Sequence, residues 1–412
     1  MKSLTRSAAF QQLLSNRAFD IEFNGYLSNH AKHATIALER LDAPESRLQE
    51  YWDFYTALTP YNLSLHPVTE SYHDIQPCTR DEWNTLRGKK EKFWNMCKFL
   101  EAELTNTGSV ERLVQKYAPD NLPGLAGALT HGIIHLGWAL DAYDLKNPWM
   151  VIEGLAYLNF SYLSCHPENF SHGAIREATP LESIRRIAQV WEEDNLADSW
   201  IAKARARYDE QSGFHAELVP AGFQWELSKI LDQQHPIMYQ LPTWLDAMDI
   251  SSLLEELYKT SVLLYLSTLD PEDGHGNFLV LHLITSLWGL EHVLNVINDE
   301  KVSRSALKCY YVVMVGLLST SAGGIPSVGA IDDAAGMLSS SDHSAKKIES
   351  NDNYWPSIVA RAIREEEEHN IKLVYVAREL WQRYNHWTGF REAANTFTIP
   401  PNIGPSSISF KA

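Results

Sequence analysis

The 412-residue chain is poor in positive charge. Its 35 Lys and Arg residues face 52 Asp and Glu residues, which gives a formal net charge of −17. Nucleic acids and anionic membrane surfaces both require a cationic surface on the protein that binds them. We therefore expect neither a nucleic acid nor a membrane among the partners of this protein, and the charge leaves its oligomeric state open.

Cysteine is also scarce, with four residues and no CxxC pair: Cys78, Cys97, Cys165 and Cys309. In a chain of this length such cysteines are typical of free core thiols in a reducing compartment. The first residues, MKSLTRSAAFQQLL, lack the continuous apolar segment of a secretion signal. These features predict a cytoplasmic protein.

Long apolar runs are missing as well. The most membrane-like stretch, Cys309–Ile331, carries no charge, but its apolar part is only about half a membrane span. A Ser-Ala-Gly-Gly-Ile-Pro segment then interrupts it. This pattern predicts a buried core helix.

Strand signals are few, whereas helical periodicity and helix caps are frequent. Thr79 to Glu82 and Thr179 to Glu182 both have the form of a capping box. We predict an all-α fold, a single large multi-helix domain over residues 1–412 with a buried metal site between helices. Residues 325–353 and 396–412 are predicted to be flexible. The predicted helices cover about 28–41, 45–58, 80–105, 109–117, 124–143, 147–164, 181–208, 250–268, 277–298, 303–320 and 354–386.

Against this background the 16 histidines stand out, because several lie on apolar helices. His131 and His135 lie four residues apart in the uncharged segment LAGALTHGIIHLGWAL, so they project from one helix face. Two imidazoles on one buried face can chelate a divalent metal. Two core histidines bound to backbone carbonyls would give the same pattern, and the sequence supports both interpretations equally.

A second histidine, His282, lies in the middle of the uncharged segment NFLVLHLITSLWGL. A lone histidine there is more often a hydrogen-bonded core residue than a ligand. His275 and His292 lie at the edges of this segment, so we interpret them as structural or exposed.

Near the N-terminus, His30 begins a helix face that continues through Ala34, Ala37 and Leu41. The small alanines would let a partner helix come close to His30, although a histidine that merely starts a helix fits equally well. His33 lies off this face and is predicted to be on the surface.

In the last long helix, His369 and Lys372 share a face with Val376 and Leu380. The neighbouring acids Glu366–Glu368 fit a solvated, charged helix face. A lysine in line with apolar residues fits that interpretation less well, because burying an ammonium group is costly.

Four segments together resemble the questin oxidase-like family, which is associated with oxidative cleavage of anthraquinone-type polyketides. They contain Asn-His, H-x-x-x-H-L-G, Leu-His and Glu-His-x-x-Lys elements in the family's order. The segments are residues 23–55, 129–144, 278–294 and 366–380.

The resemblance implies a helical enzyme with a buried non-haem Fe²⁺, held by histidines and by a lysine carboxylated on its side-chain nitrogen. On this basis the metal ligands are His30, His135, His282, His369 and Lys372. His131 would be a second ligand or would act beside the metal in catalysis.

The chemistry of Lys372 is consistent with this role. Burial lowers the pKa of a lysine, so that the neutral amine can react with CO₂ to give a carbamate. A carbamate is a hard oxygen donor, which with imidazoles would complete a mixed nitrogen and oxygen site for iron.

The resemblance also implies a reaction of O₂ with a small aromatic or polyketide substrate. The outcome would be ring cleavage, by a dioxygenase or by a Baeyer–Villiger-type monooxygenase. The second reaction is ordinarily driven by NADPH, but no G-x-G-x-x-G turn between a strand and a helix is present to bind this cofactor.

Two further interpretations remain. A metal-dependent hydrolase could also use a carboxylated lysine, but the buried helices show no second cluster of acidic ligands. A non-enzymatic α-helical binding protein with incidental core histidines is the other alternative.

Overall fold

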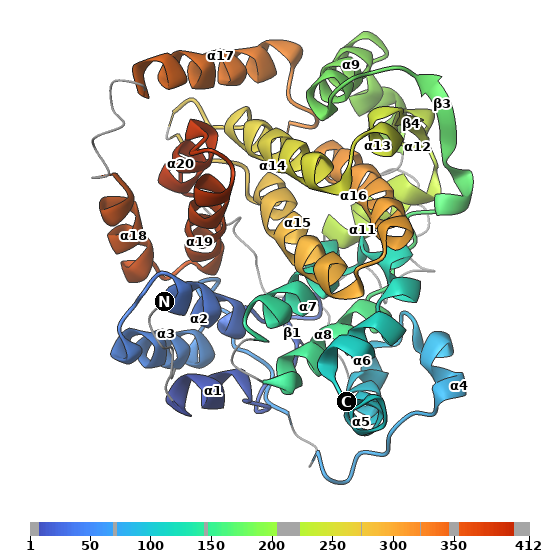
Figure 1. The fold of residues 1–412 in the computed structure, drawn as a ribbon, viewed down its shortest axis with the longest axis vertical. Coiled ribbons are helices and arrows are strands. Elements are labelled where there is room, and N and C mark those ends of the chain that lie inside the picture. The colour runs from blue at the N-terminus through green and yellow to red at the C-terminus, as the bar shows by residue number, and fades with distance from the viewer. Residues whose placement is uncertain are drawn as a thin grey trace. The chain divides into compact units, whose positions relative to one another are not determined.

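A computed structural model describes residues 8–68, 72–143, 147–203, 223–272, 274–321, 323–345 and 354–398. Helices make up most of these residues (Figure 1), so the predicted all-α class is confirmed. Strands within the described ranges form only two short pairs. β1 (Glu22–Phe23) is antiparallel to β2 (Leu27–Ser28), and β3 (Ser171–Ile175) is parallel to β4 (Gln240–Pro242).

The chain divides into two compact units, so the single domain over residues 1–412 stays a prediction. The first unit comprises Met1–Ser164, Trp288–Ser303 and Asn402–Ala412, and the second comprises Cys165–Leu287 and Arg304–Pro401. The helices that lie wholly in the first unit are α1 (Ala8–Leu14), α2 (Ala31–Arg40), α3 (Glu45–Ala57), α4 (Arg80–Trp83), α5 (Phe93–Thr107), α6 (Val110–Tyr117), α7 (His131–Asp141) and α8 (Pro148–Phe160).

The second unit contains most of the remaining helices. These are α9 (Pro180–Glu193), α11 (Phe223–Asp232), α12 (Pro236–Tyr239), α13 (Trp244–Ala247), α14 (Ile250–Leu266), α17 (Val328–Ala345), α18 (Tyr354–Arg364), α19 (Glu368–Arg383) and α20 (Thr388–Asn395). Two helices contribute residues to both units, α15 (Phe278–Ile297) and α16 (Glu300–Thr320).

In the first unit, α7 is packed tightly between α8 and the C-terminal half of α15. A Cβ atom on Gly137 of α7 would overlap the Cα of Gly289 on α15, and one on Gly154 of α8 would lie 2.5 Å from the Cα of Leu136. Only glycine permits helices to approach this closely. As a result α7 is buried along almost its whole length.

The segment before α7 departs from the predicted helix over 124–143. Ala128, Leu129 and Thr130 all have positive φ angles, of 48°, 51° and 69°. A left-handed conformation is unfavourable for residues with a Cβ atom, at about 1–2 kcal/mol each. The helix therefore begins only at His131, directly after a strained turn.

Three other predicted segments also differ from the structure. Residues 328–345, predicted to be part of a flexible loop, form α17, because Ile331, Ala334 and Leu338 give it a buried face. The predicted helix over 80–105 is broken at Gly88, whose φ is +77°. The predicted helix over 354–386 is two helices, α18 and α19. Of the predicted tail, residues 399–412 lie outside the described residues.

The core of the second unit is built around α14, α15 and α16. The hydroxyl of Tyr310 on α16 donates to the carbonyl of Leu283 on α15 and lies 3.2 Å from the hydroxyl of Ser261 on α14. The residues of α16 from Cys309 to Leu318 are buried, which confirms the predicted core helix.

Among the described helices, α15 alone is long and apolar enough to cross a membrane. It has 20 residues and a mean hydropathy of 1.4. Of the most apolar stretch of this helix, 83% is buried inside the protein. A buried core helix of a soluble protein has these same properties.

Candidate metal-binding clusters

His30 lies at the junction between the β1–β2 hairpin and α2. The hairpin turns at Asn24 and Gly25, both with positive φ angles, and returns the chain to the start of α2. His30 is the residue that precedes the first turn of this helix, and its backbone N–H donates to the hydroxyl of Tyr55. Its side chain is buried, because the residue is only 3% exposed.

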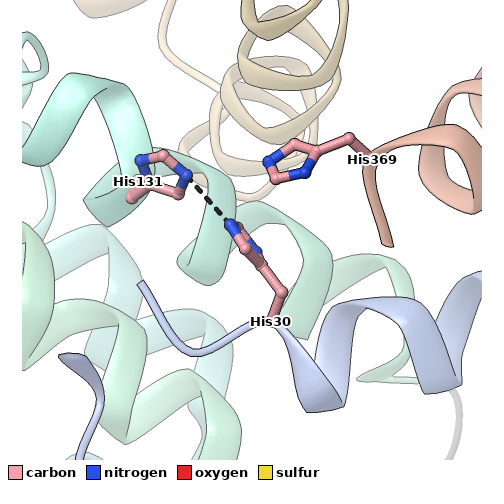
Figure 2. A group of neighbouring side chains, drawn as sticks. All are labelled: His30, His131 and His369. Atoms are coloured by element: carbon pink, nitrogen blue, oxygen red, sulfur yellow. Dashed lines mark hydrogen bonds between the residues drawn. The ribbon is translucent and has the colours of Figure 1, made fainter. Parts of the chain in front are cut away.

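His131, the first residue of α7, faces His30. Its Nδ1 lies 2.6 Å from the carbonyl oxygen of Ala128 in the strained turn, and its Nε2 lies 3.1 Å from the Nε2 of His30 (Figure 2). A carbonyl can only accept, so Nδ1 of His131 carries the proton and Nε2 carries the lone pair. The turn before α7 thus orients the imidazole of His131.

His33, predicted to be on the surface, is buried, and the prediction was wrong. All residues of α2 from Ala31 to Leu38 are buried, so this helix has no solvent-facing side there. The Nδ1 of His33 lies 2.8 Å from Nδ1 of His30, and its Nε2 lies 3.0 Å from Nδ1 of His135. His30, His33, His131 and His135 form what we call the N-terminal histidine cluster.

A buried ion pair lies at the end of this cluster. Glu153 on α8 has Oε2 at 2.5 Å from Nζ of Lys32 and at 3.6 Å from Nε2 of His135. Burial opposes the charge of Glu153, but Lys32 and His135 together outweigh this effect and hold the pKa of the carboxyl below its usual value. Burial likewise lowers the pKa of His135. A cavity of about 20 Å³, large enough for one water, is lined by Lys32, His135 and Glu153 among others.

In the second unit, His282 on α15 is held in the same way as His131. Its Nδ1 lies 2.9 Å from the carbonyl oxygen of Phe278, one turn earlier in the helix. Burial, together with the nearby charge of Lys372, lowers the pKa of His282 to about 3. The ring is therefore neutral, with the lone pair on Nε2, and its centroid lies 4.9 Å from that of His369.

His369, in the first turn of α19, is fixed by a carboxylate. Its Nδ1 lies 2.6 Å from Oε1 of Glu367, while Glu368 is fully buried beside it. Ligand atoms of Glu367, Glu368 and His369 all lie within 4.8 Å of one another, which is suitable for holding a metal ion. The sequence prediction that Glu367 and Glu368 are solvated was wrong, because the first turn of α19 points into the protein.

Lys372 is fully buried, one turn after His369. Burial lowers the pKa of Lys372 to about 8, although the charges of Glu368 and Glu367 act in the opposite direction. Burial also raises the pKa of Glu367, helped by Glu368 and opposed by Lys372. We call His282, Glu367, Glu368, His369 and Lys372 the C-terminal cluster.

The predicted site residues are thus divided between the units. His30, His131 and His135 belong to the N-terminal histidine cluster, and His282, His369 and Lys372 belong to the C-terminal cluster. Sequence reasoning missed Glu153 and His33. Glu153 could have been noticed, because it is the only charged residue in the helix segment PWMVIEGLAYLNF.

The geometry of the N-terminal histidine cluster fits a bound metal ion. Two nitrogens that ligate one ion at about 2.1 Å are about 3.0–3.4 Å apart, and the Nε2 atoms of His30 and His131 are 3.1 Å apart. His135 is arranged differently, since its two nitrogens face His33 and Glu153. Imidazoles whose Nδ1 is held by an oxygen acceptor are typical metal ligands, and His131, His282 and His369 all have this arrangement.

The comparison with known protein families gives a match over most of the chain. The model of the family described as questin oxidase-like matches residues 27–377, a range that contains every member of both clusters. No curated protein matches the chain. Family membership supports an oxygenase-type function on an aromatic substrate. The chain belongs to the questin oxidase-like family.

Proposed function

We propose that this protein is a non-haem iron oxygenase that opens a ring of a quinone or related aromatic polyketide. The observation that supports this most strongly is the set of buried histidines, His131, His282 and His369, whose Nδ1 atoms are each held by an oxygen acceptor. This arrangement presents Nε2 as the ligating atom. Imidazole nitrogens with an anionic oxygen donor are a suitable ligand set for Fe²⁺.

Iron, when bound, would supply the binding and activation of O₂. The chain's own part is to hold the donors in a dry interior, since His30, His131, His282 and His369 are all buried. In our proposal His131 is a ligand rather than only a catalytic residue, because its Nε2 faces that of His30. The ligand set that the family resemblance implies, His30, His135, His282, His369 and Lys372, stays a prediction.

The oxygen donor in this proposal is a carbamate on Lys372. The low pKa of this lysine, about 8, supports it, because a larger share of the side chain is then the neutral amine that reacts with CO₂. Glu367 and Glu368 lie on the same helix end, and Glu367 orients His369 through Nδ1. The two carboxylates would then serve as hydrogen-bond acceptors around the site.

Metal analysis tests the proposal directly. Purified protein should contain stoichiometric iron, and H131A, H282A and H369A should each lower metal affinity at least about a hundredfold. The matched control is H292A, because His292 lies on the same helix as His282 and has the same bond from Nδ1 to the carbonyl four residues earlier. Unchanged iron content in all three variants would contradict the proposal.

Isotope labelling separates the two oxygenase outcomes. A dioxygenase places both atoms of ¹⁸O₂ in the product and consumes no external reductant. A Baeyer–Villiger-type reaction inserts one atom and releases the other as water, which takes two electrons and two protons from a reductant such as NADPH. Because the sequence has no dinucleotide-binding turn, we expect any NADPH to be used by another protein.

A hydrolase is the second candidate, and one observation favours it. The acidic ligands that the buried helices were thought to lack are present as Glu367 and Glu368 beside His369. A hydrolase would hold zinc, act without O₂ and take its new oxygen atom from water. Label from H₂¹⁸O rather than from ¹⁸O₂ in the product would select this candidate.

A further inference from the structure

The N-terminal histidine cluster contains more than metal ligands. His33 and His135 extend from His30 towards the ion pair of Glu153 and Lys32, so that four imidazoles and a carboxylate form one continuous series within the first unit. The role of His33, His135 and Glu153 inferred from this series rests on the proposed function, in which His30 and His131 bind the metal.

Without metal, the direction of every hydrogen bond in the series follows from one fixed end. The carbonyl of Ala128 requires a proton on Nδ1 of His131, so the Nε2 of His131 accepts from Nε2–H of His30. A neutral imidazole has one N–H, so Nδ1 of His30 accepts from Nδ1–H of His33. By the same rule, Nε2 of His33 accepts from Nδ1–H of His135.

This direction leaves a mismatch at the other end. Nε2 of His135 carries a lone pair and faces Oε2 of Glu153 at 3.6 Å, so two acceptors oppose each other in a buried place. At this distance the two atoms make no direct hydrogen bond, and only a water in the cavity that His135 and Glu153 line could serve both acceptors. A reversal of the series would place an N–H on Nε2 of His135, so that a donor rather than a second acceptor faces the carboxylate.

We propose that metal binding reverses this series, so that His33 and His135 change tautomer and Glu153 becomes the positioning acceptor of the metal site. A metal held by Nε2 of His30 would require the proton of that ring to be on Nδ1, which would then donate to His33. His33 would in turn donate through Nε2 to His135, and His135 would direct its Nε2–H towards Glu153, directly if the 3.6 Å separation shortens or through one water in the cavity between them. Each ring has one N–H before and after, so no proton is gained or lost.

The reversed series resembles the carboxylate–histidine–metal arrangement of other metalloproteins, extended by two histidines. By accepting from His135, the carboxylate of Glu153 makes Nδ1 of His135 a better acceptor for His33 and Nδ1 of His33 a better acceptor for His30. Its final effect is to make Nε2 of His30 a stronger ligand. The ammonium of Lys32, 2.5 Å from Glu153, keeps that carboxylate ionised. His33, His135 and Glu153 are therefore positioning residues and do not touch the metal.

The direct test uses wild-type protein and Zn²⁺ as a diamagnetic probe. In protein labelled with ¹⁵N-histidine, the protonated nitrogen of His33 and of His135 should change from Nδ1 to Nε2 when Zn²⁺ is added. Unchanged tautomers in zinc-loaded protein would overturn the inference while leaving the proposed function intact. Failure of the wild-type protein to bind any metal would instead overturn the proposed function.

Affinity measurements with a competing chelator give a second test. H33A and E153Q should each weaken Zn²⁺ binding about 10–100-fold. Because the residues act in one series, the effects of the two substitutions should not multiply. The affinity of H33A/E153Q for Zn²⁺ should be at most about threefold lower than that of the single variant that binds Zn²⁺ less tightly. Fully multiplied effects would show that the residues act separately and would overturn the series.

Two further variants distinguish a specific loss of metal affinity from a general loss of stability. E153Q leaves the buried ammonium of Lys32 without its carboxylate, so the double variant K32M/E153Q, which removes both charges, should show the same loss of affinity. E103Q is the matched control, since Glu103 is also a buried carboxylate of the first unit that is paired with a lysine, Lys116. A loss of Zn²⁺ affinity in E103Q as large as that in E153Q would overturn the specific role of Glu153.

Discussion

Glu367 fixes His369 with one carboxylate oxygen and caps helix α19 with the other. Oε1 lies 2.6 Å from Nδ1 of His369, and Oε2 accepts from the backbone N–H of Asn370 at 3.0 Å. The start of the helix and the orientation of the imidazole therefore depend on the same side chain.

Replacing Glu367 should affect metal binding more than folding. We expect E367Q to keep its one amide oxygen on the backbone N–H of Asn370 but to lower metal affinity about 10–100-fold, because the amide NH₂ group then faces Nδ1 of His369 and cannot accept from it. Chelator competition measures the affinity, and thermal unfolding measures the stability. As a control, D249A removes the cap of α14 and should lower only the thermal midpoint. Equal metal affinity in E367Q and wild type would contradict this role.

His131 and His135 should differ as ligands. H131A removes a nitrogen that faces His30 and should abolish stoichiometric metal binding, whereas H135A should retain the metal with about 10–100-fold lower affinity. Metal content after dialysis checks both variants. The opposite result, with binding lost only in H135A, would restore the ligand set predicted from the sequence.

Carboxylation of Lys372 should be visible by spectroscopy. Protein loaded with Zn²⁺ in ¹³C-bicarbonate should give a carbamate ¹³C signal, and metal affinity in CO₂-free buffer should fall at least about tenfold. K372M should lack this signal. The control is K32M, because Lys32 is also buried but is paired with Glu153. A carbamate signal that persists in K372M would refute the assignment.

The acid stability of the protein should depend on Glu103. Burial alone would raise the pKa of this carboxyl, but hydrogen bonds from Lys116, Tyr117 and Asn106 lower it to about 2. Since the folded-state pKa is below the ordinary 4.5, its stabilising effect is complete above pH 4.5 and is lost as the pH falls towards 2. Solvent around Lys116 limits the effect to about 1–2 kcal/mol.

Urea unfolding at several pH values checks this expectation. E103Q should be less stable than wild type at pH 6 and equally stable near pH 2. Replacement of an exposed carboxylate on α6 in E111Q should leave the stability unchanged at both pH values. A constant difference between E103Q and wild type across this range would show that the carboxyl does not titrate as described.

The sequence predicted the long helices better than it predicted what lies between them. Apolar periodicity correctly indicated α14, α15 and α16, because burial in a core leaves a clear pattern. It did not reveal the turn at Ala128–Thr130, since none of these residues is a glycine and only the surrounding packing imposes positive φ angles. Helix α17 was missed because its buried face consists of only a few apolar residues among small polar ones.

The clusters were predictable where a polar residue interrupted an apolar helix, as at His282. The sequence could not place His33, because a helix buried on every side has no exposed face to contrast with a buried one. It also could not show that Glu367 and Glu368 point inward. Their burial depends on the first turn of α19 lying inside the unit, which local charge patterns do not encode.

The close contact of Gly137 and Gly289 has a consequence for how this protein can vary. Any side chain at either position would push α7 away from α15, because a Cβ atom there has no space. His131 and His135 both lie on α7, so such a shift would move both imidazoles together. Substitution of either glycine is therefore expected to displace the histidines of α7, although neither glycine belongs to the N-terminal histidine cluster.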